Sequence, residues 1–158
     1  MKTKLLLVAV AAASAFVLLG GVGASANPAT GFTPTPLAKG NLAQPVEISA
    51  RGIDFSTESS TDVYIQKATF AAFGNTGWHQ HPGLVVVNVK SGTLIHHTGC
   101  LATVVHTGES FVETPLTTGM VENPHPETAE VFFTIIVPKD SPARIEAVAP
   151  NCSSEGSD

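Results

Sequence analysis

The sequence predicts an all-β domain, folded as a sandwich or barrel, from three observations. Short apolar stretches enriched in β-branched and aromatic residues recur between residues 46 and 148. Turn-forming glycines lie between or beside these stretches, and no 3.6-residue apolar period is sustained beyond the first 26 residues. Many short strands without interleaved helices are typical of a β-sandwich or a barrel.

The N-terminal segment, residues 1–26, has the layout of a secretory signal peptide. Two lysines precede a mostly apolar stretch over residues 5–22, and the small residues 24–26 follow it. We expect cleavage before Asn27 and an exported chain, either secreted or held in the cell envelope. An uncleaved membrane anchor is the alternative, because an apolar stretch of 18 residues can begin to span a bilayer.

The rest of the chain divides into an arm, one domain and a tail. Residues 27–45 hold four prolines among small residues, which predicts an extended arm or linker. Residues 46–150 suit a single domain with a buried core, and residues 151–158 read as a polar tail. Residues 27–158 carry 6 Lys and Arg against 13 Asp and Glu, a formal charge of −7. This acidic balance argues against nucleic acid as a partner.

The domain is expected to contain ten strands. The stretch 131–137 is apolar at successive positions, so it is expected in the centre of a sheet, and Pro138 is expected to end it. The ten candidate strands are residues 46–49, 63–73, 78–81, 84–90, 93–97, 103–106, 111–113, 120–122, 130–138 and 144–148.

The chain has only two cysteines, Cys100 and Cys152. In an exported protein an even number of cysteines most often pairs, so we expect a disulfide between them. Its loop of about 50 residues corresponds to about 4 kcal/mol in the chain-entropy model. A reactive or metal-binding thiol is the alternative interpretation.

Two histidines separated by one residue, His79 and His81, are the strongest chemical signal. Successive side chains of a strand alternate between its faces, so both imidazoles are expected on the same face, where they can converge on one metal ion. Trp78 takes the opposite face, where it caps the mouth of the barrel or packs outside it.

The residues around this pair resemble the cupin family. Its first motif, G(X)5HXH(X)3,4E(X)6G, is matched at His79, His81 and Gly92, and its second, G(X)5PXG(X)2H(X)3N, at Gly108 and Asn123. The resemblance covers roughly residues 63–138. It implies a cupin jelly-roll barrel, also called a double-stranded β-helix.

In cupins, three histidines and one glutamate hold a divalent transition metal such as Fe, Mn, Zn, Ni or Cu. Here Val85 stands at the glutamate position and Gly119 at the third histidine, so the resemblance implies a reduced site of two histidines. Glu122 has the wrong alternation to face the lumen, and His125 lies in a turn, so either would need a β-bulge to become a third ligand.

The remaining histidines are interpreted as polar residues at strand ends or rims. His96 and His97 are adjacent, so one is expected to face the interior and the other the solvent, with the register left open. His106 lies near a turn and is expected to bond to the backbone rather than to a metal.

Two functions are consistent with these features. In the first, an exported cupin binds a small molecule in the lumen through a metal held by His79 and His81, with the reaction unassigned. In the second, a metal-free barrel is a binding or structural module of the cell envelope. Association with a membrane is expected only through an uncleaved signal segment. The family resemblance also implies a possible homodimer, with residues 27–50 exchanged between copies.

Overall fold

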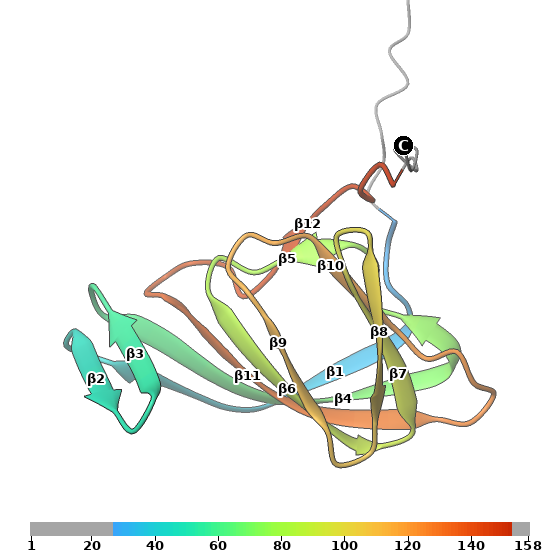
Figure 1. Cartoon of the computed structure of the whole chain (residues 1–158), viewed down its shortest axis with the longest axis horizontal. Coiled ribbons are helices and arrows are strands. Elements are labelled where there is room, and N and C mark those ends of the chain that lie inside the picture. Colours follow the sequence, from blue (N-terminus) through green and yellow to red (C-terminus); the bar gives the residue numbers. More distant parts are fainter. Residues whose placement is uncertain (1–26, 153–158) are drawn as a thin grey trace, which may run out of the picture.

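The computed structural model describes residues 27–152, which form twelve β-strands and no helix (Figure 1). The predicted signal peptide and residues 153–158 of the predicted tail lie outside the described residues. The strands are β1 (Thr30–Leu42), β2 (Val46–Ala50), β3 (Ile53–Thr57), β4 (Thr61–Asn75), β5 (His79–Gln80), β6 (Leu84–Ser91), β7 (Thr93–Thr98), β8 (Leu101–His106), β9 (Ser110–Glu113), β10 (Gly119–Glu122), β11 (Ala129–Pro138) and β12 (Ile145–Glu146).

Ten of these strands form one antiparallel sheet that curls around a lumen (Figure 1). One side consists of β1, β4, β11, β6 and β9, and the other of β12, β5, β10, β7 and β8. The two sides are joined where Glu122 of β10 pairs with Asn75 of β4. The expected all-β fold is confirmed, and each of the ten expected stretches contains a strand.

The core side chains point into the lumen from both sides of the barrel. Alternate residues of the central strands point inward, as the period of two requires. In β11, which pairs with both β4 and β6, four inward residues are almost fully buried. The buried apolar side chains are Ala68, Phe70, Val85, Val87, Val89, Leu94, Val105, Val121, Ala129, Val131, Ile135 and Val137.

The predicted arm is part of the main sheet, which corrects the interpretation of residues 27–45 as a linker, while its side chains are mostly exposed, as a segment with little to bury. Strand β1 pairs with β4 from Thr30 to Leu42, and Phe32 packs on Phe70 with ring centroids 5.0 Å apart. Its prolines are compatible with this pairing because β1 pairs only with β4, and an edge strand tolerates missing N–H donors.

Strands β2 and β3 form a separate hairpin that projects from one end of the barrel (Figure 1). The turn residues Arg51 and Gly52 have φ values of +54° and +80°, the two positive angles that suit a tight hairpin turn. The expected barrel domain, residues 46–150, therefore begins with a hairpin outside the main sheet, and β3 was not among the expected strands.

The C-terminal segment returns across the barrel. Strand β12 pairs with β5, and Cys152 forms a disulfide with Cys100 in the turn between β7 and β8. This is the cysteine pair expected from the sequence. Within residues 27–152, no helix is long and apolar enough to cross a membrane.

Candidate metal centre

Both histidines of the sequence pattern lie inside the barrel, His79 on β5 and His81 directly after it. His79 and His81 are 4% and 6% exposed, and their rings meet edge to face with centroids 4.9 Å apart. The intervening Gln80 points the other way and donates to Thr118 Oγ1 at 2.7 Å. Trp78 also lies on the outer side, edge-on to the His97 ring. The alternation expected from the sequence thus brings the two imidazoles together.

Backbone carbonyls fix the orientation of both rings. His79 Nδ1 lies 2.9 Å from the carbonyl oxygen of Gly77, and His81 Nδ1 is hydrogen-bonded to the carbonyl oxygen of Ala143. Because a carbonyl oxygen can only accept, each Nδ1 must carry the proton and donate it. The Nε2 atom of each neutral ring therefore presents a free lone pair, and it faces the lumen. Metal-binding histidines typically donate the proton of their other ring nitrogen to a carbonyl or carboxylate in this way.

The carbonyl of Gly77 depends on a glycine at this position. Gly77 has a φ of +65°, and a Cβ atom here would lie 2.2 Å from the carbonyl oxygen of Asn27. Any side chain would therefore both strain the backbone and clash with the backbone of residues 27–29. The turn before β5 is held further by Asn75 Oδ1, which accepts from the Gly77 amide at 2.9 Å.

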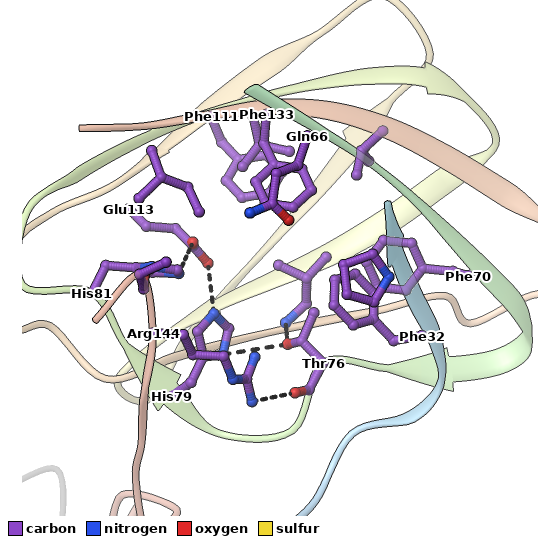
Figure 2. Close-up of a pocket in the computed structure, with 16 residues that line it drawn as sticks. Phe32, Gln66, Phe70, Thr76, His79, His81, Phe111, Glu113, Phe133 and Arg144 are labelled. Atoms are coloured by element: carbon purple, nitrogen blue, oxygen red, sulfur yellow. Dashed lines mark hydrogen bonds and ion pairs between the residues drawn. The ribbon is translucent and has the colours of Figure 1, made fainter. Parts of the chain in front are cut away.

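A third candidate ligand is Glu113 at the end of β9, a residue that sequence reasoning missed. Its carboxylate lies 3.2 Å from His81 Nε2 and 3.8 Å from His79 Nε2 (Figure 2). The ligand atoms of these three residues all lie within 4.8 Å of one another. Two imidazoles and one carboxylate are a donor set that divalent transition metals commonly use.

Strand register explains why Glu113 reaches this place. Val85 of β6, at the position where the cupin pattern has glutamate, pairs directly with Glu113 of β9. Residues opposite each other in an antiparallel pair point to the same face, so the carboxylate enters the lumen from the neighbouring strand. The sequence does place Glu113 on the same face of β9 as Phe111, two residues earlier. The residues of β9 alone do not show whether that face points inward.

The electrostatics of this group favour a bound cation. Oε1 of Glu113 is the buried side-chain atom without a hydrogen-bond partner among the described residues. Burial by itself raises the pKa of Glu113, but the hydrogen bonds and charge interactions with His79 and His81 outweigh it and hold the pKa well below its ordinary value. When the imidazoles are neutral, three acceptors face one another, and one metal cation can satisfy all three.

His96 is the interior member of the adjacent histidine pair. It is 7% exposed, stacks on Phe111 with centroids 4.2 Å apart, and places Nε2 3.9 Å from Glu113 Oε1. Burial lowers its pKa, which the Glu113 carboxylate opposes. A Cβ atom at Gly119 would point to this region, 3.9 Å from His96 Nε2. His96 therefore occupies space that a larger residue 119 would need.

The other ligand candidates lie elsewhere. His97 faces outward and is 3.0 Å from Glu122 Oε1, so Glu122 follows the outward alternation expected for it. His106 is exposed and contacts Thr93 Oγ1 at 3.2 Å, and His125 is exposed in the turn after β10. None of these residues belongs to the metal-binding group.

A cavity of about 250 Å³ adjoins the centre (Figure 2). The two histidines and Glu113 form part of its wall, and apolar side chains from β1, β4, β6, β9 and β11 form most of the rest. The structure therefore combines a candidate metal centre with an apolar space large enough for a small molecule.

Comparisons with solved structures find cupins. A RmlC-like cupin from Shewanella frigidimarina aligns at 16% identity and a TM-score of 0.48, covering 70% of this chain and 79% of that chain. The cupin domain of Schizosaccharomyces pombe Cnp3 aligns at 10% identity and a TM-score of 0.49, covering 78% and 70%. An oxalate oxidase in complex with the substrate analogue glycolate aligns at 20% identity and a TM-score of 0.48.

The oxalate oxidase alignment covers 54% of this chain and 46% of the oxidase, so the chain spans less than half of that protein. No protein-family model and no curated protein sequence matches the chain. At these identities the likenesses concern the fold alone. The strand topology confirms the all-β barrel expected from the sequence, and the cupin assignment stays a prediction.

Proposed function

We propose that this chain is an exported metal-binding protein of cupin fold, and that its lumen binds a small molecule at a divalent transition metal. His79, His81 and Glu113 hold the ion, which extends the two-histidine site expected from the sequence by one carboxylate. When bound, such an ion supplies a Lewis acid at one end of the cavity.

The observation that carries this proposal is the convergence of three acceptors in a buried place. Both Nδ1 atoms are committed to carbonyl oxygens, so the two Nε2 atoms are the ring nitrogens that face the Glu113 carboxylate. A buried, unpartnered carboxylate oxygen is costly, and coordination to a metal removes that cost. Export is supported by the Cys100–Cys152 disulfide, since such bonds persist in oxidising compartments.

The test is metal binding by the purified protein at pH 8, with Mn, Fe(II), Ni, Cu and Zn added separately. We expect one ion per chain by elemental analysis and a fall in affinity of more than about 100-fold in His79→Ala and His81→Ala, since loss of an outer-shell partner alone costs up to that much. His106→Ala, an exposed histidine outside the lumen, is the matched control and should bind as the unmodified protein does.

Absence of stoichiometric metal in folded protein after reconstitution would contradict the proposal. That result would favour the metal-free envelope module, in which the two histidines share protons with Glu113. Circular dichroism on each variant separates loss of metal binding from loss of the fold.

A further inference from the structure

The cavity beside the metal centre has few polar groups available to a ligand. Arg144 and Thr76 lie in its wall, but both are committed to protein partners (Figure 2). Arg144 Nη2 donates to the Thr76 carbonyl oxygen at 2.6 Å and to Glu146 Oε2 at 3.0 Å. Thr76 Oγ1 accepts from the Val121 amide at 2.9 Å. The charge of Arg144 is thus already balanced by Glu146.

Gln66 is the polar side chain in the wall that keeps its hydrogen-bonding capacity free. It stands on β4 opposite Phe133 of β11, and its amide points into the cavity (Figure 2). Within residues 27–152 its side chain has no hydrogen-bond partner. An amide offers two donors and an acceptor, so it can bind a hydroxyl or carbonyl of a ligand. The cavity therefore offers two polar points, the metal and Gln66, separated by apolar wall.

The size of the cavity limits the ligand. Its 250 Å³ equals about eight times the ~30 Å³ that one water occupies in the liquid, which suits a molecule of roughly ten non-hydrogen atoms. Aromatic side chains line this space from several strands. They are Phe32, Phe70, Phe111 and Phe133. A planar ring or a short aliphatic body fits such walls, and a sugar with many hydroxyl groups would leave most of them unpaired.

Charge limits the ligand further. A divalent ion together with the Glu113 carboxylate leaves one positive charge in a buried place, and no other uncompensated cationic side chain lines the described cavity. One negative charge on the ligand balances it, whereas a second would be buried without a partner. The ligand is therefore best matched by a single anionic oxygen group that reaches the metal.

We propose, resting on the metal site above, that the lumen binds small apolar monocarboxylates, oriented by the metal at the carboxylate and by Gln66 at a hydrogen-bonding group on the body. The juxtaposition of the triad, the aromatic wall and the free Gln66 amide in one cavity carries this assignment.

The test measures binding of benzoate to the metal-loaded protein by calorimetry. Phthalate, which has two carboxylates, and benzyl alcohol, which has none, should each bind at least about tenfold more weakly than benzoate. All three have the same ring, but only benzoate has the single negative charge that balances the site. The metal-depleted protein, kept in chelator, should lose benzoate binding. Metal content is measured first on the same sample.

The role of Gln66 is tested with the three hydroxybenzoate isomers. One isomer should bind more tightly than benzoate, and Gln66→Leu should remove that advantage, a loss of about 2-fold to 10-fold for one hydrogen bond. Gln44→Leu, at an exposed glutamine between β1 and β2, is the matched control and should preserve the advantage. Metal affinity should be equal in both variants.

Each outcome has a separate meaning. If no metal binds, the proposed function fails, and with it this inference. If metal binds but benzoate does not, or if phthalate or benzyl alcohol binds as tightly, the ligand class is wrong while the metal site stands. Equal binding of benzoate with and without metal would also overturn the ligand proposal. The proposal would fail likewise if Gln66→Leu kept the preference for one hydroxybenzoate isomer.

Discussion

At the scale of single residues, the candidate metal centre depends on which ring nitrogens of His79 and His81 donate to the backbone. His79 and His81 are buried side by side, and each donates its Nδ1 proton to a backbone carbonyl. Glu113 then faces two lone pairs, with its Oε1 unpartnered. Without a cation this arrangement is destabilising, because a buried carboxylate needs donors or a positive charge. A site that binds metal well is thus expected to reduce the stability of the metal-free protein.

Replacing Glu113 by glutamine should separate these two effects. In Glu113→Gln the amide can donate to His81 Nε2, so the free energy of unfolding in chelator at pH 8 should rise by about 1–3 kcal/mol. Metal affinity should fall, because the charged ligand is lost. Denaturant unfolding with and without metal measures both. Glu122→Gln, which faces outward against His97, should change stability by less than about 1 kcal/mol. A less stable Glu113→Gln in chelator would contradict this reasoning.

At the scale of elements, β4 connects the parts of the barrel. It pairs with β1 along one edge and with β11 along the other, and its end meets β10. Lys39 of β1 forms an ion pair with Asp62 of β4 at 3.0 Å, and Asp62 Oδ2 also accepts from the Asp140 amide at 3.3 Å. Asp62 therefore holds both β1 and the turn after β11 against the start of β4.

The Lys39 contact predicts an acid-dependent loss of stability. The hydrogen bond from Lys39 lowers the pKa of Asp62 in the folded state, so the ionised carboxylate stabilises the fold above its ordinary pKa of 3.8. That contribution is lost as the pH falls below about 4 and through the lowered pKa. Unfolding free energies of the unmodified protein and Asp62→Asn should therefore differ by a constant amount above about pH 5 and converge in acid. A difference independent of pH would exclude this contribution.

At the scale of the whole molecule, the C-terminal segment forms part of the wall of the site. Ala143 supplies the carbonyl for His81, Arg144 binds the Thr76 carbonyl, and β12 pairs with β5. The disulfide between Cys100 and Cys152 then fixes the end of this segment to the turn between β7 and β8. The same segment therefore contacts the residues of the candidate metal centre and is held to the barrel by a covalent bond.

Removing the disulfide should lower stability substantially. The bond closes a loop with a sequence separation of 52 residues, so Cys100→Ser/Cys152→Ser should reduce the free energy of unfolding by about 4 kcal/mol. Chemical denaturation of the double variant and of the oxidised protein measures this difference. A single Ser153→Ala variant controls for changes to the tail itself. Equal stability with and without the bond would show that the closed loop is already constrained by other contacts.

The sequence by itself determined the all-β fold, the central place of β11 and the shared face of His79 and His81, because apolar runs and period-two alternation are local properties of a strand. Only the tertiary structure decided that β1 joins the sheet despite its prolines, since edge pairing depends on a partner far along the chain. It also decided that Glu113 completes the centre. Which face of β9 is inward follows from its register with β6, and no stretch of sequence contains that register.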